Sequence, residues 1–147
     1  SGGAVSFDSD SIVSNTTFYS NTATVFGGAI YAFGSATIAN AHFYSNSVAE
    51  TGNPNSSNGG AAYLNGSATI LNSGFIGNYA TGQAGALLSM GNADITNTQF
   101  ISNVTEASAG AVSLNGVFSL NTVTFTHLVM AVLCFHSYRE PCQTPCL

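Results

Sequence analysis

The chain of 147 residues is 45% hydrophobic but only 5% charged, and its formal net charge is −5. Its single Lys or Arg residue, Arg139, argues against a nucleic-acid partner, which needs a basic patch. The length allows one domain with a sizeable core, and the apolar content argues against disorder. The longest apolar run, 128–135, is far shorter than the roughly 20 residues that span a bilayer, so we expect no membrane span. Polarity from Ser, Thr, Asn and Gly is typical of extracellular or cell-surface proteins.

Pairs of small residues followed by alanine recur along the chain. They begin at Gly2, Gly27, Gly59, Ala84 and Ala109, so the successive intervals are 25, 32, 25 and 25 residues. The long interval contains a Gly-, Pro-, Asn- and Ser-rich insertion at about 50–58, which is typical of a surface loop. The chain is therefore built from five similar units with a period of 25 residues.

Other residue types keep the same register in these units. A phenylalanine lies 16 residues after each start and an aliphatic residue lies 11 after it, while asparagines lie 13 and 19 residues after the first four starts. The phenylalanines are Phe18, Phe43, Phe75, Phe100 and Phe125; the asparagines are Asn15, Asn40, Asn72 and Asn97 at the first offset, and Asn21, Asn46, Asn78 and Asn103 at the second. Agreement at so many positions is not chance.

A period of this length fits a leucine-rich repeat, a helical repeat or a β-solenoid. Lysine is absent and leucine is sparse, whereas β-branched, aromatic, Gly and Asn residues prevail, and this composition favours strands and turns. We therefore predict an all-β parallel β-helix over residues 1–127, with about five coils of 25 residues. In chain order, each coil has three short strands: Gly-Gly-Ala-Ile-Tyr, Ala-Thr-Ile-x-Asn and the Phe-x-x-Asn stretch.

Alternation along the second strand places Ala36, Ile38 and Asn40 on one inward face. Coils stacked about 4.8 Å apart put each inward residue on its equivalent. We therefore expect aliphatic rows, a phenylalanine ladder and asparagine ladders in which each amide bonds its neighbours. Because Asn15 and Asn103 are ladder residues, we expect both to be buried.

The motif "GGAI" at Gly27, its variants "GGAV", "GGAA", "AGAL" and "AGAV", and the stretches "FYSN", "FIGN" and "FISN" resemble the repeats of the chlamydial polymorphic outer-membrane proteins. The resemblance covers about residues 1–127. It implies a right-handed parallel β-helix of the kind found in autotransporter passengers, with an adhesive role at the cell surface.

Enzymes with this fold, such as pectate lyases, need clustered acidic and basic side chains on one sheet. The acidic residues here are Asp8, Asp10, Glu50, Asp94, Glu106 and Glu140, and their positions in the repeat keep any three from converging. We expect no catalytic residue and no cofactor. Asp8 and Asp10 are read as a solvated turn rather than a calcium site. His42 and His127 lie on different coils, so solvent-facing strand positions are favoured over a shared metal.

Aromatic and asparagine side chains offer two further candidates. Tyr31 and Tyr63 share one outward position, and Tyr19 and Tyr44 share another; we favour cross-strand packing over stacking on sugar rings. Asn-x-Ser/Thr sequons occur at Asn15, Asn55, Asn65 and Asn103. Only Asn55, in the insertion, and Asn65, in a turn, are predicted to be glycosylation sites.

Residues 128–147 depart from the repeat and are predicted to form a cap or a docking segment. They hold Cys134, Cys142 and Cys146, for which a disulfide within the chain, a disulfide to another chain and a free thiol remain open. The three cysteines are a poor zinc set because a fourth spaced ligand is missing. An open β-helix exposes strand edges at its ends, so we expect end-to-end self-association, which builds filaments if it does not close.

Together these features predict a non-catalytic extracellular or cell-surface module with a structural or adhesive role. A filament protomer, a carbohydrate-binding protein and a pectate-lyase-like β-helix are the alternatives. A host surface or a glycan is the expected class of ligand.

Overall fold

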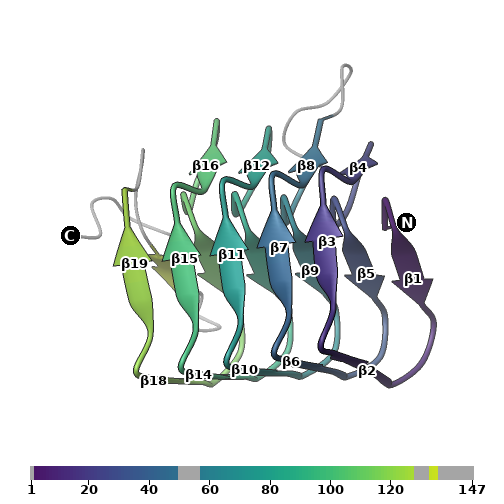
Figure 1. The fold of residues 1–147 in the computed structure, drawn as a ribbon, viewed down its shortest axis with the longest axis vertical. Helices are drawn as coiled ribbons and strands as arrows, with labels where there is room; N and C mark the ends of the chain where they lie inside the picture. Colours follow the sequence, from purple (N-terminus) through teal and green to yellow (C-terminus); the bar gives the residue numbers. More distant parts are fainter. Residues whose placement is uncertain (1, 50–56, 128–132, 136–147) are drawn as a thin grey trace.

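The computed structural model describes residues 2–49 and 57–127 and the backbone of 133–135. In this part of the chain the regular structure is all β, and the strands stack as successive coils of a parallel β-solenoid (Figure 1). We call the sheets A to D in the order in which each coil visits them. The expected all-β parallel β-helix is confirmed.

Sheet A comes first in each coil and sheet B second. The strands of sheet A are β1 (Val5–Phe7), β5 (Ile30–Ala32), β9 (Ala62–Leu64), β13 (Leu87–Ser89), β17 (Val112–Leu114) and β20 (Leu133–Phe135). Those of sheet B are β2 (Ser11–Ser14), β6 (Ala36–Ala39), β10 (Ala68–Leu71), β14 (Ala93–Thr96) and β18 (Phe118–Asn121).

Sheet C carries the Phe-x-x-Asn stretch, and sheet D follows it. The strands of sheet C are β3 (Thr17–Tyr19), β7 (His42–Tyr44), β11 (Gly74–Ile76), β15 (Gln99–Ile101) and β19 (Thr124–Thr126). Those of sheet D are β4 (Thr22–Ala23), β8 (Ser47–Val48), β12 (Tyr79–Ala80) and β16 (Val104–Thr105). Sheet D was not predicted: its strands have two residues each, too short to show an alternating pattern.

Every pair of neighbouring strands is parallel and places equivalent repeat positions opposite each other. Phe43 is paired with Phe18 on one side and with Phe75 on the other, and Ile70 lies between Ile38 and Ile95. The insertion between the second and third coils leaves this register unchanged.

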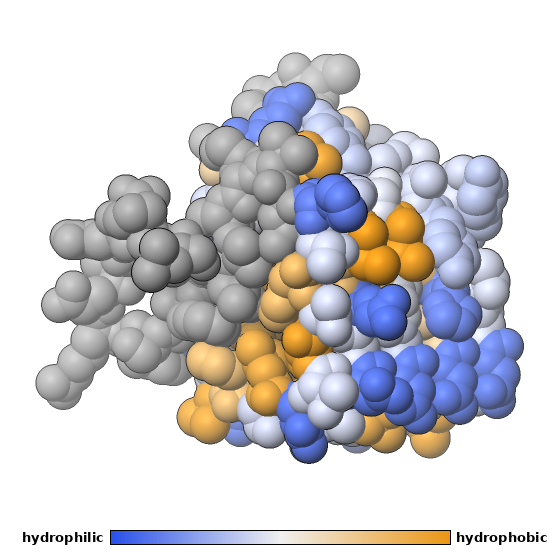
Figure 2. Space-filling model, turned by 60° about the vertical axis from the view of Figure 1, so that its left-hand side comes forward, coloured by the Kyte–Doolittle hydropathy of each residue, from blue (hydrophilic) through white to orange (hydrophobic). Residues whose placement is uncertain are grey.

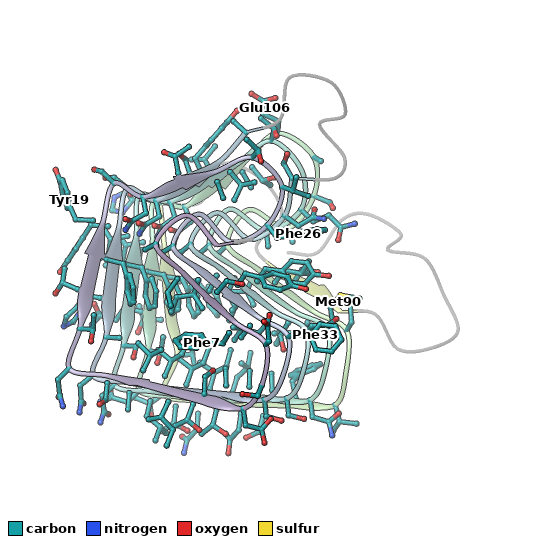
Figure 3. The ribbon with its side chains drawn as sticks, turned by 90° about the vertical axis from the view of Figure 1, so that its right-hand side faces the viewer. Phe7, Tyr19, Phe26, Phe33, Met90 and Glu106 are labelled. Atoms are coloured by element: carbon teal, nitrogen blue, oxygen red, sulfur yellow. The ribbon has the colours of Figure 1, made fainter. Side chains whose placement is uncertain are left out.

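Rows of like side chains fill the interior, which Figure 3 shows along the coil axis. The five phenylalanine rings stack nearly parallel, with centroids 5.0, 4.5, 4.9 and 5.2 Å apart along the row. Phe43, Phe75 and Phe100 have no exposed surface. The aliphatic row of sheet B, with Ile38, Ile70 and Ile95, is equally inaccessible.

A left-handed residue turns the chain between sheets B and C. At this corner Asn15, Asn40, Asn72 and Asn97 have φ angles of 52°, 51°, 49° and 48°, a conformation that asparagine tolerates better than most residues. The prediction that Asn40 points inward with Ile38, and that Asn15 is buried, is wrong. The left-handed turn ends the alternation of the strand, so these side chains are exposed.

The second asparagine of each unit follows another left-handed corner, between sheets C and D. Asn46, Asn78 and Asn103 are fully buried, and each side-chain Oδ1 accepts hydrogen bonds from the backbone N and the Nδ2 of the asparagine one coil earlier. Each Nδ2 also donates to the carbonyl of a phenylalanine in the previous coil. We call this row, beginning at Asn21, the inner ladder.

Close approach of neighbouring backbones explains the paired glycines. A Cβ at Gly28 would lie 2.0 Å from the Gly60 carbonyl oxygen, and one at Gly60 would lie 2.0 Å from that of Gly85. The first glycine of the second unit, Gly27, has a φ of +55°, which glycine adopts at no steric cost. The pair therefore lets the chain turn from sheet D into sheet A against the next coil.

Candidate functional site

The outward face of sheet C carries a hollow in the third coil. Strand pairing places Thr17, His42, Gly74, Gln99 and Thr124 in one outward row. Gly74 is the member of this row without a side chain, and a hollow of about 300 Å³ lies over it. We call this feature the Gly74 hollow.

His42 and Gln99 stand on either side of the Gly74 hollow. They lie on strands next to β11, so the gap between them is two strand spacings, roughly 9.6 Å. Both side chains are exposed. The His42 Nδ1 atom lies 3.0 Å from the point where a Cβ of residue 74 would sit, so the imidazole leans over the space that the glycine leaves.

The other two walls differ in polarity. On one side Tyr44 and Ile76, both half-buried, supply apolar surface, and the Tyr44 ring lies 6.0 Å from that of His42. On the opposite side are the exposed amides of Asn72 and Asn97. The hollow therefore has one apolar wall and one wall of neutral hydrogen-bonding groups.

The amide wall belongs to a second asparagine row, which we call the outer ladder. Its Nδ2 groups donate to the Oδ1 atoms of the preceding coil, at 3.3 Å from Asn40 to Asn15, 3.3 Å from Asn72 to Asn40 and 2.8 Å from Asn97 to Asn72. This corner runs along the lower edge of the molecule, where Figure 2 shows a row of hydrophilic residues. Among the described residues no donor reaches the Oδ1 atom of Asn97.

A similar hollow of about 290 Å³ lies on sheet B, over the outward positions of Thr69, Asp94 and Ser119. Asp94 is its single charged side chain. Val117 at its edge is 78% exposed. One isolated carboxylate without a neighbouring base or cation gives this hollow no acid–base pair.

The acidic residues are dispersed, as the sequence predicted. Asp10 accepts a hydrogen bond of 2.8 Å at Oδ1 from the backbone N of Ser35 in the next coil, so this carboxylate fastens two turns together. Within residues 2–49 and 57–127, no three His, Cys, Asp or Glu side chains are grouped closely enough to hold a metal ion. Glu50 and Glu140 lie outside the described residues.

Glu106 has a partner that sequence reasoning missed. Its Oε1 accepts a hydrogen bond of 2.5 Å from the Tyr79 hydroxyl. This bond, followed by burial and the charge of Glu106, raises the pKa of Tyr79 above 10.0. The two residues lie 27 positions apart, so a search at one repeat length plus two could have found them.

The two histidines of the repeat region do not meet. His42 lies on β7 and His127 directly follows β19, which is three strands away in sheet C. This separation is roughly 14 Å, too far for one metal ion to be held by both.

Tyr31 and Tyr63 pack against each other and against Phe26. The tyrosine rings are 5.6 Å apart, and the Phe26 ring lies 4.5 Å from Tyr63. Burial, and to a smaller extent the neighbouring Tyr31, raise the pKa of Tyr63. Figure 3 shows Phe26 on the side of the coil that also carries Phe33 and Met90. The geometry favours cross-strand packing, because these rings cover one another.

The sequons have different surroundings. Asn103 is buried in the inner ladder, whereas Asn15 is exposed and Asn65 is half-buried. Asn55, Cys142, Cys146 and the side chain of Cys134 lie outside the described residues. Of the tail, only the backbone of 133–135 is described, and it continues sheet A beside β17.

The family model of the Chlamydia polymorphic membrane protein (Pmp) repeat matches residues 15–32. The match begins at the outer ladder, includes Phe18 and Asn21, and ends in β5 after the Gly-Gly-Ala-Ile motif. The chain is a β-solenoid of Pmp-type repeats. The Pmp-type match spans the step from the first coil to the second, and the later coils carry the same residue types in the same register.

No curated protein and no solved structure matches the chain. Among the residues that the structure describes, no helix is long and apolar enough to cross a membrane.

Proposed function

We propose that the chain is a non-catalytic scaffold of the cell surface, with a structural or adhesive role. The name of the matching repeat family, a membrane protein family, supports the surface location. The observation that carries the proposal is the division of labour in the repeat: the phenylalanines and inner-ladder asparagines stack inside, while neutral polar and aromatic residues line the outside.

Stacking explains why the outward faces carry so little charge. Each side chain lies beside its equivalent in the next coil, about 4.8 Å away, and like charges at that distance repel. Each row therefore offers the same neutral groups at regular intervals. Weak contacts repeated along a rigid face gain strength together, which suits attachment to a surface that also presents repeated groups.

Attachment is measured with fluorescent beads coated with the folded chain. The beads are incubated with cultured epithelial cells and washed under flow, and beads coated with the heat-unfolded chain serve as the matched control. We expect more folded-chain beads to remain bound. Equal retention of the two bead types would overturn the adhesive role.

The first coil supports a second role, as the protomer of a filament. In the described part of the chain, strands β1 to β4 pair with a neighbour on one side only, and Phe18 stacks on one phenylalanine, Phe43. Open strand edges with half-covered apolar rows favour the addition of another chain. Light scattering and electron microscopy test this role: rods that lengthen with concentration support it, and short rods of one size at every concentration contradict it.

A further inference from the structure

We propose that the Gly74 hollow on sheet C binds one neutral sugar unit. This inference rests on the proposed adhesive function and names its ligand class and its site. It differs from a lectin built on Tyr31 and Tyr63, whose rings are packed against each other and against Phe26.

The shape of the hollow comes from one missing side chain. The row has a side chain at His42 and at Gln99, and the buried backbone of Gly74 forms the floor between them. The opening of roughly 9.6 Å accepts a single pyranose ring with its hydroxyl groups. On the neighbouring strands the same position is filled.

The walls match the two kinds of surface that a sugar ring presents. Sugar hydroxyls both donate and accept hydrogen bonds, as do the amides of Gln99, Asn72 and Asn97. The Oδ1 atom of Asn97 is open to a donor, since its own ladder bond uses Nδ2. The C–H face of a sugar is apolar, and Tyr44 and Ile76 supply the apolar wall.

Charge narrows the ligand class further. The lining of the hollow contains no Asp, Glu, Lys or Arg, and His42 is its one titratable side chain. A sialic acid, a uronic acid or a phosphorylated sugar would bring a charge that no opposite charge meets here. The site therefore suits a neutral hexose or an N-acetylhexosamine.

Saturation-transfer NMR with the full chain and free glucose, galactose, mannose, N-acetylglucosamine and N-acetylgalactosamine tests the inference. We expect at least one of these sugars to bind, and Gly74→Gln to weaken that sugar by at least about tenfold, because the new side chain fills the hollow. Thr17→Gln is the matched control in the same outward row, two strands from Gly74, and it should leave affinity unchanged. Binding by none of the sugars, or equal binding by Gly74→Gln, overturns the inference.

The fold of the variants is checked by far-UV circular dichroism. A Cβ at residue 74 meets only the ends of the His42 and Ile76 side chains, so we expect Gly74→Gln to fold. His42→Ala is the second variant: it removes an exposed wall without filling the floor and should also weaken the sugar.

The bead assay separates this inference from the proposed function. If wild-type beads adhere to cells and Gly74→Gln beads adhere equally well, the sugar site fails and the adhesive role stands. If wild-type beads do not adhere, the adhesive role fails, whatever the sugar result.

Discussion

Replacing Asn78 by alanine removes the centre of the inner ladder. Asn78 Oδ1 accepts from the backbone N and Nδ2 of Asn46, at 2.9 and 3.0 Å. Its Nδ2 donates to the Phe43 carbonyl and to Asn103 Oδ1, at 3.0 and 2.9 Å. The backbone N of Asn46 is left buried without its acceptor, which costs about 1–3 kcal/mol, and each of the other lost bonds contributes about 1 kcal/mol. We expect a loss of about 4 kcal/mol in the free energy of unfolding.

Asn72→Gly is the matched control in the same coil. Asn72 belongs to the outer ladder, is exposed and has a φ of 49°, which glycine adopts without strain. Its loss should cost no more than about 1 kcal/mol. Urea denaturation followed by far-UV circular dichroism measures both variants. Equal losses for the two variants, or a loss below about 1 kcal/mol for Asn78→Ala, would refute the reasoning; an Asn78→Ala chain that does not fold meets the expectation.

Three further predictions concern the core, pH and modification. Phe75→Ala should lower the free energy of unfolding by about 3–5 kcal/mol, because the ring is fully buried between two others, whereas Phe33→Ala, at a ring 59% exposed, should have little effect; similar losses would contradict the ladder. Glu106→Ala should lower the raised pKa of Tyr79 in an ultraviolet absorbance titration, and the stability that this bond gives should be present below pH 10.0 and lost as pH rises through the raised pKa. Expression through a eukaryotic secretory pathway, followed by peptide mass spectrometry, should find a glycan at Asn65 and none at the buried sequon of the inner ladder.

The periodicity of the sequence was enough to predict the coil. Stacking repeats one environment in every coil, so a phenylalanine in the core recurs at the same offset, as Phe43 and Phe75 do. The inward direction of the second asparagine follows from the same logic. Internal repetition served in place of an alignment, because the five units report on one another.

The corners and the hollow could not be predicted from the same pattern. Alternation assumes extended backbone, and it fails where Asn40 takes up a left-handed conformation and turns outward. The strands of sheet D are too short to show a period. The Gly74 hollow depends on a departure from the repeat, since a glycine matters there only because His42 and Gln99 flank it.

Hydrogen exchange of asparagine side-chain amides tests the central claim most directly: one asparagine row holds the coils together while the other faces outward for binding. In a chain labelled with ¹⁵N at asparagine, NMR resolves the two rows. The Nδ2 protons of Asn46, Asn78 and Asn103, which are fully buried, should exchange slowly, and those of Asn40, Asn72 and Asn97, which are exposed, should exchange rapidly. Similar exchange rates in both rows would contradict the account.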